Sequence, residues 1–183
     1  MTRLFVAIRP PRLLRERLLA LMGGVMGARW QSDEQLHVTL RFIGEVDRHC
    51  AADVAAALGS VHHAAFDLAL DGIGHFDRKG RIESLWAGVG PHEPLKALHQ
   101  KIDQALVRVG LPGEQRAYLP HLTLARFGRA GATGPVEPFL GRTAGLSSPP
   151  VRIVDFCLYE SSLGRDGASY TIVERYPLEP AAR

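Results

Sequence analysis

Hydrophobic positions along the chain follow two periods, which together predict a protein built from strands and helices. Short apolar or alternating runs predict strands at residues 4–8, 36–46, 66–76, 82–89, 119–127, 151–159 and 169–178. Apolar residues at helical spacing predict helices at 13–26, 51–61 and 94–109, and residues 128–150 read as a Gly- and Pro-rich loop with one helical turn. Turns are expected at 77–80 and 164–167. This order favours a mixed α/β or α+β sheet protein.

Two of the predicted strands carry nearly the same string of residues. Residues 36–44 read LHVTLRFIG and residues 120–128 read PHLTLARFG, so the pattern His-apolar-Thr-Leu occurs twice, 84 positions apart. One copy of so short a pattern would be a weak signal, whereas two copies inside longer matching strings are a strong one. The repeat indicates a duplicated, pseudo-symmetric architecture.

The strand geometry of this motif predicts a polar site. Successive side chains of a strand point to opposite faces, so His37 shares a face with Thr39, and His121 shares a face with Thr123. The apolar residues of each motif occupy the other face and can be buried. Two such strands facing one another would present two imidazoles and two hydroxyls to one ligand.

These four side chains suit the cleavage of a phosphodiester without a metal ion. One neutral imidazole can take a proton from an attacking water, and one imidazolium can give a proton to the departing oxygen. Threonine hydroxyls can donate to the non-bridging phosphate oxygens. A zinc site is the alternative, but no carboxylate or cysteine recurs at ligand spacing beside both histidines.

Composition and charge narrow the class of protein. The chain has 183 residues, 46% of them hydrophobic, which suits one domain or two closely fused lobes. A net charge of +3 permits an anionic ligand without requiring one. Cys50 and Cys157 lie far apart and outside any CxxC pattern, so we expect free thiols. With no apolar stretch near the ~18 residues that a membrane helix needs, we expect a cytoplasmic protein with no membrane partner.

The motif pair resembles the 2H phosphoesterase superfamily, which is defined by two HxTx motifs. Within it, the chain is similar to the bacterial and archaeal RNA 2′,3′-cyclic phosphodiesterases, also called 2′-5′ RNA ligases. The similarity extends over nearly the whole chain, through the strings RLFVAI, TLRFIGEV, SLWAGV, PHLTLARFG and YTIVERYPL. It implies an α+β fold of two pseudo-symmetric lobes, with antiparallel sheets, outer helices and a central cleft. Residues 1–183 would form one such domain, with one motif per lobe, at 37–40 and 121–124.

The resemblance also implies roles for individual residues. His37 would be the proton donor and His121 the proton acceptor, and Thr39 and Thr123 would hold the phosphate. Arg126 matches the arginine of the family's HxTLxR string, which reaches the phosphate. Phe42 matches an aromatic able to stack on a nucleobase, with a core phenylalanine as the alternative.

One residue near the first motif has no role in the family pattern. Ideal alternation places Arg41 on the same face as His37.

The activity implied is hydrolysis of a 2′,3′-cyclic phosphate at an RNA 3′ end to a 2′-phosphate, with reverse 2′-5′ ligation as a further possibility. No metal and no cofactor is expected, and the expected partners are RNA 3′ ends or nucleotide 2′,3′-cyclic phosphates, bound by a monomer. Two alternatives remain open: a 2H phosphodiesterase for a small cyclic nucleotide or 2′-5′ oligonucleotide, and a non-catalytic RNA- or nucleotide-binding module.

Overall fold

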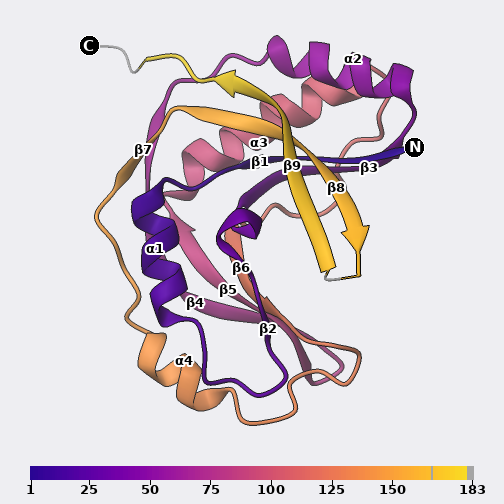
Figure 1. Cartoon of the computed structure of the whole chain (residues 1–183). Coiled ribbons are helices and arrows are strands. Elements are labelled where there is room, and N and C mark those ends of the chain that lie inside the picture. The colour runs from indigo at the N-terminus through magenta and orange to yellow at the C-terminus, as the bar shows by residue number, and fades with distance from the viewer. Residues whose placement is uncertain (166, 181–183) are drawn as a thin grey trace.

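A computed structural model shows how the elements assemble, and it describes residues 1–165 and 167–180 (Figure 1). The strands are β1 (Thr2–Ile8), β2 (Arg29–Trp30), β3 (Val38–Val46), β4 (Phe66–Arg78), β5 (Arg81–Gly90), β6 (His121–Arg126), β7 (Val151–Ile153), β8 (Asp155–Gly164) and β9 (Gly167–Pro177). The helices are α1 (Arg12–Leu21), α2 (Arg48–Gly59), α3 (His92–Arg108), α4 (Glu137–Thr143) and a short 3₁₀ helix, η1 (Asp33–Gln35).

The strands form one antiparallel path that divides into two similar halves. The order is β7-β4-β5-β6-β3-β1-β8-β9, and β2 pairs with the end of β6, at Ala125 and Arg126. Four strands, β7-β4-β5-β6, make one half and four, β3-β1-β8-β9, make the other. The halves meet where β3 pairs with β6, and these are the two strands that carry the repeated motif. The expected α+β class, with antiparallel sheets and a pseudo-symmetric layout, is confirmed.

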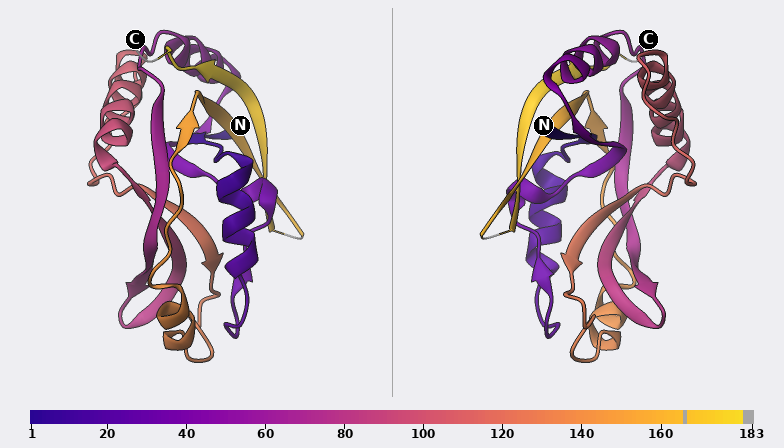
Figure 2. Two further views of the ribbon diagram at one scale, coloured as in Figure 1. Left: turned by 90° about the vertical axis from the view of Figure 1, so that its left-hand side faces the viewer. Right: turned by 90° about the vertical axis from the view of Figure 1, so that its right-hand side faces the viewer.

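The helices cover the sheet from outside because each has one apolar face. In α3, Leu95, Leu98, Ile102 and Leu106 recur at intervals of three or four and are fully buried. In α1, the buried residues Leu14 and Leu18 are one turn apart. Figures 1 and 2 show α2 and α3 side by side at one end of the molecule and α4 at the other. None of the helices in the described residues has the length and apolar character needed to span a membrane.

Several element boundaries differ from those predicted. The helix predicted at 13–26 ends at Leu21, because the next residue is extended and Gly23 and Gly24 adopt positive φ values of 130° and 74°. The single strand predicted at 151–159 is divided at Val154 into β7, which pairs with β4, and β8, which pairs with β1. The predicted loop at 128–150 contains the seven-residue helix α4, and β2 was not predicted.

Candidate active site

The two HxTx motifs meet at the centre of the sheet. Strands β3 and β6 pair antiparallel through the apolar second residue of each motif, and both of these residues are buried. In this register His37 lies across from Thr123, and Thr39 lies across from His121. Because side chains alternate along a strand, the four polar side chains share the face that points away from the core. The predicted quartet is therefore assembled on one surface.

One extra residue interrupts each motif strand directly after its threonine. Opposite β1 the unpaired residue is Leu40 of β3, and opposite β5 it is Leu124 of β6. Such a β-bulge shifts the alternation of the side chains that follow it. The residue five positions after each histidine, Phe42 in β3 and Arg126 in β6, therefore joins the histidine face. A β-bulge at the same motif position therefore occurs in both halves.

The expectation that Arg41 lies on the His37 face is wrong, and the bulge is the reason. The Arg41 side chain is only 8% exposed and points to the helix side of β3. Its Nε donates to Asp103 Oδ1 of α3 at 2.7 Å, and its Nη2 donates to the carbonyl of Pro112. Arg41 thus ties both α3 and the segment 109–120, which leads into β6, to the first motif strand.

Two further side chains hold the backbone at the bulge of β3. Nδ1 of His99, on α3, lies 2.6 Å from the Leu40 carbonyl, and the Tyr118 hydroxyl donates to the Thr39 carbonyl at 2.9 Å. The His99 and Tyr118 rings stack with centroids 4.3 Å apart. Carbonyls at a disrupted part of the ladder need partners when they are shielded from water. His99 and Tyr118 thereby fix the backbone conformation that places Phe42 on the histidine face.

His37 lies in an aromatic corner between β1 and β9. Its ring centroid is 4.9 Å from that of Phe5 and 5.2 Å from that of Tyr170, which approaches edge-on. Its Nδ1 is 2.7 Å from the carbonyl of Gln35. The Gln35 side chain in turn donates to the carbonyl of Ala168 at 2.7 Å, which links η1 to β9. The orientation of the imidazole is therefore set by a braced segment of backbone.

His121 has a matching environment in the other half. Its ring centroid is 5.0 Å from that of Phe76 and 5.9 Å from that of Trp86, and its Nδ1 is 2.7 Å from the carbonyl of Leu119. The indole of Trp86 lies over Gly74, where a Cβ atom would come within 2.3 Å of the ring. Glycine at this position lets the indole lie flat on β4 beside the histidine.

Both imidazoles are held in the same tautomer. A backbone carbonyl can only accept a hydrogen bond, so Nδ1 of His37 and of His121 carries the hydrogen and Nε2 is left for a ligand. Burial lowers the pKa of His37 from 6.5 to about 4, with smaller contributions from the charges of Arg126 and His121. Burial, followed by Arg126, also lowers the pKa of His121. Without a ligand, both rings are mainly neutral at pH 7.

Two cavities border the motif side chains. One, of about 270 Å³, is lined by His37, Thr39, Phe42 and Arg126. The other, of about 530 Å³, reaches Thr39, Phe42 and His121 and extends past the edge of β3 to Arg41, His99 and Tyr118. Phe42 is 46% exposed and borders both cavities, so it is not a core residue. The guanidinium of Arg3 lies 5.2 Å from the centroid of its ring.

The structure brings all six candidate residues to one face and adds others that the sequence did not single out. His37, Thr39, Phe42 and Arg126 line one cavity, and Thr123 is half-buried beside them. The additional residues are the aromatic walls of the histidines, namely Phe5, Tyr170, Phe76 and Trp86. Their only sequence signal was their place on the predicted strands at 4–8, 66–76, 82–89 and 169–178. In the described residues, no group of three or more His, Cys, Asp or Glu side chains is placed to hold a metal ion.

Comparisons with known proteins agree with this geometry. The protein is 32% identical to the RNA 2′,3′-cyclic phosphodiesterase of Aeropyrum pernix over 75% of this chain and 79% of that one. It is 29% identical to the enzyme of the same name from Archaeoglobus fulgidus, over 92% and 96% of the two chains.

Solved structures show the same fold. The apo form of Escherichia coli LigT superposes with a TM-score of 0.79 at 28% identity, covering 97% of this chain and 98% of that one. A Thermus thermophilus structure superposes with a TM-score of 0.80 at 26% identity, over 98% and 100%. The family model described as the 2′-5′ RNA ligase superfamily matches residues 14–165, which include both motifs. The chain therefore belongs to the 2′-5′ RNA ligase superfamily, a family of 2H phosphoesterases.

Proposed function

We propose that this protein hydrolyses the 2′,3′-cyclic phosphate at RNA 3′ ends to a 2′-phosphate, using side chains alone. The observation that carries the proposal is the pair of tautomer-locked imidazoles on one face, with Arg126 close enough to lower the pKa of both. The two curated relatives described above are named for this activity. One solved LigT structure contains 3′-AMP and another contains phosphate, so the fold of that relative accommodates a nucleotide.

In the proposed reaction each histidine moves one proton through Nε2. Neutral His121 takes a proton from water, and the oxygen of that water forms a bond to phosphorus. The bond between phosphorus and O3′ breaks, and O3′ takes a proton from protonated His37. The product carries a 2′-phosphate and a 3′-hydroxyl. The two histidines end with exchanged protonation states, which solvent then resets.

The neighbouring side chains have distinct proposed tasks. Thr39 and Thr123 lie across from the histidines, where their hydroxyls would donate to the non-bridging oxygens as charge accumulates. The planar guanidinium of Arg126 would bind two phosphate oxygens at once. Phe42 stands half-exposed between the two cavities, where a nucleobase would stack on its ring.

The proton-donor role of His37 requires that the substrate change its pKa. With a pKa of about 4, His37 is almost entirely neutral at pH 7 in the free protein. A bound phosphate anion would offset the charge of Arg126 and favour the imidazolium. His37 would then be protonated only when substrate is bound. Because burial disfavours the imidazolium, it is a strong acid, which suits proton transfer to a poor leaving group such as a ribose oxygen.

The same cleavage of the bond to O3′ would join two RNA molecules if a 5′-hydroxyl took the place of water. The linkage formed would be 2′-5′, which is the ligation that the family name describes.

We further propose that a single chain acts as one two-lobed domain and as a monomer, because both motif histidines come from the same chain. Both cysteines are free thiols, which suits a reducing compartment such as the cytoplasm. Light scattering of the purified protein would test the monomer.

A substrate comparison tests the activity directly. We expect conversion of an RNA oligonucleotide with a 2′,3′-cyclic phosphate end into one with a 2′-phosphate, followed by ³¹P NMR. His37→Ala and His121→Ala should each lose about 10²–10⁴-fold in kcat, the usual loss for a missing proton-transfer group. Arg48→Gln, on the exposed start of α2, is the matched control and should keep full activity. A wild-type protein that binds this RNA without converting it would be a binding module instead.

A change of leaving group tests the assignment of the two histidines. A p-nitrophenolate leaves readily as an anion, so a p-nitrophenyl diester needs little help from a general acid but still needs an activated water. We expect this analogue to rescue His37→Ala at least partly while His121→Ala stays inactive. The opposite result, with His121→Ala rescued, would reverse the two roles.

A further inference from the structure

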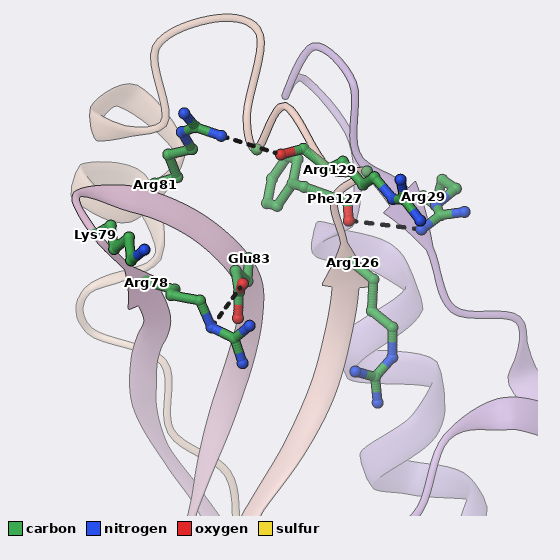
Figure 3. Close-up of a pocket in the computed structure, with 10 residues that line it drawn as sticks. Arg29, Arg78, Lys79, Arg81, Glu83, Arg126, Phe127 and Arg129 are labelled. Carbon is green, nitrogen blue, oxygen red and sulfur yellow. Dashed lines mark hydrogen bonds and ion pairs between the residues drawn. The ribbon is translucent and has the colours of Figure 1, made fainter.

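A third cavity, which is strongly basic, lies beside the candidate active site and shares Arg126 with the cavity that His37 lines. Its volume is about 630 Å³, and it lies between the β4–β5 turn, the end of β6 and β2 (Figure 3). Six of its lining residues are basic and one is acidic: Arg29, Arg78, Lys79, Arg81, Arg126, Arg129 and Glu83. The formal charge of the whole chain is only +3, so the rest of the protein is net acidic. Positive charge is therefore concentrated at this one place.

The cavity is a built feature rather than a chance gathering of flexible side chains. Arg29 and Arg126 are direct partners across the β2–β6 pair. Gly131, at φ 74°, lets the segment after β6 approach the backbone of Arg81, where a Cβ would lie 3.1 Å from the Arg81 Cβ. The Arg81 Nη1 donates to the Arg129 carbonyl at 3.5 Å, which joins the two sides of the cavity (Figure 3).

Few of these charges are neutralised by the protein itself. Arg78 pairs with Glu83 at 3.4 Å, and both are well exposed. In residues 1–165 and 167–180, Arg29, Arg81 and Arg129 form no ion pair. Arg29 and Arg126 are direct neighbours across β2 and β6, so their positive charges add to the potential of the cavity. The arrangement fits a ligand that brings several negative charges.

We propose that this basic cavity binds the phosphodiester backbone of the RNA nucleotides that precede the terminal cyclic phosphate. The inference rests on the proposed function, which places the terminal phosphate at Arg126. This residue lines both the basic cavity and the cavity that His37 lines. A cyclic mononucleotide has one phosphate, which the histidines and Arg126 would occupy. The other cations need further phosphates, and a polynucleotide supplies one with each residue. The preferred substrate is therefore an RNA strand of several nucleotides rather than a small cyclic nucleotide.

The test compares a long and a short substrate in two matched double variants. Arg81→Gln/Arg129→Gln removes two exposed cations of the basic cavity and leaves Arg126 and both histidines in place. Arg48→Gln/Arg108→Gln makes the same change in net charge on α2 and α3, where both side chains are also exposed. The substrates are adenosine 2′,3′-cyclic phosphate and a hexaadenylate with the same terminus, at several salt concentrations.

We expect the cavity variant to lower kcat/KM for the hexaadenylate about tenfold at low salt and to change it less than twofold for the mononucleotide. Its plot of log kcat/KM against log salt should be shallower by about 1.4, because each lost phosphate contact on a single strand removes about 0.7. The control variant should change neither substrate by more than twofold. An unchanged hexaadenylate value, or equal losses on both substrates, would overturn the proposal.

Failure of the proposed function would appear differently. If the wild-type protein converts neither substrate, the activity is wrong, but the cavity can still be tested by binding. Fluorescence anisotropy of a 5′-labelled hexaadenylate ending in a 3′-phosphate should then show weaker binding to the cavity variant than to the control variant. Equal binding by the two variants would reject the basic cavity as an RNA site.

Discussion

Replacement of His37 by glutamine should change how the stability of the protein depends on pH. Burial against aromatic rings lowers the pKa of His37 to about 4, whereas the unfolded chain has a value near 6.5. Between these two values the unfolded state binds more protons than the folded state. The folded wild-type protein is therefore destabilised as pH falls below 6.5, and the loss is complete only below pH 4. Glutamine cannot titrate, so the variant lacks this contribution.

The size of the effect follows from the two pKa values. Proton linkage gives a loss of roughly 2 kcal/mol at pH 5 and roughly 3 kcal/mol at pH 4, relative to pH 8. For a chain of 183 residues, 1 kcal/mol corresponds to about 2–4 °C in Tm, so the predicted change at pH 5 is about 4–8 °C. The difference in unfolding free energy between wild type and His37→Gln at pH 8 is the reference. Relative to it, the difference at pH 5 should shift by roughly 2 kcal/mol in favour of His37→Gln.

Urea unfolding at pH 8, 6, 5 and 4 would measure the difference, and NMR titration of the His37 ring would locate its pKa independently. His121→Gln is the matched comparison, because burial and Arg126 lower the pKa of that histidine in the same direction. A wild-type-minus-variant difference that stays constant from pH 8 to pH 4 would refute the reasoning. It would mean that water or local motion solvates the His37 imidazolium.

Three further predictions follow from the site. Activity should survive EDTA, because acid and base are side chains, whereas loss on chelation restored by a divalent ion would contradict the mechanism. Arg126→Lys should lower kcat/KM at least ~10-fold by losing the bidentate fork, and an unchanged rate would remove Arg126 from the site. Arg41→Met should cost about 2–4 kcal/mol in denaturant unfolding, because Asp103 then keeps only the backbone N–H of Glu114 as a donor, and adding Asp103→Leu should recover part of that cost.

The elements of the fold could be predicted from local sequence patterns more readily than their ends and pairings. Apolar periodicity located most of the strands and the three long helices, because buried faces impose the period. It did not reveal β2, whose two residues are too few to show an alternation. It also merged β7 with β8, because the break at Val154 depends on each part pairing with a different strand. Pairing is a tertiary property that local periodicity does not contain.

The site could be predicted where it depends on repeated residue types, and not where it depends on backbone irregularities. The two HxTx motifs are visible as a repeat, and the strand period correctly places each histidine with its threonine. The same period fails one residue later, because Leu40 and Leu124 are bulged. Arg41 was therefore assigned to the wrong face, whereas Phe42 and Arg126 were found only through family resemblance. A bulge depends on how the partner strand pairs, so it cannot be predicted from either motif alone.

The two bulges explain how a symmetric backbone can produce an asymmetric site. Each bulge turns the fifth residue after its histidine into the cleft, and these residues are an aromatic ring in one half and a guanidinium in the other. In the proposed function Phe42 would stack on a base and Arg126 would bind a phosphate, so the two halves would favour different parts of one ligand. Arg126 also lowers the pKa of both histidines, and a bound phosphate would cancel that effect. Burial is the larger cause of the lowered pKa of His37, so a bound phosphate would also have to act directly, as a counter-charge beside the imidazolium. The bound substrate would thus complete the acid, and the symmetry between the halves is broken by the two residues that follow the bulges rather than by the backbone.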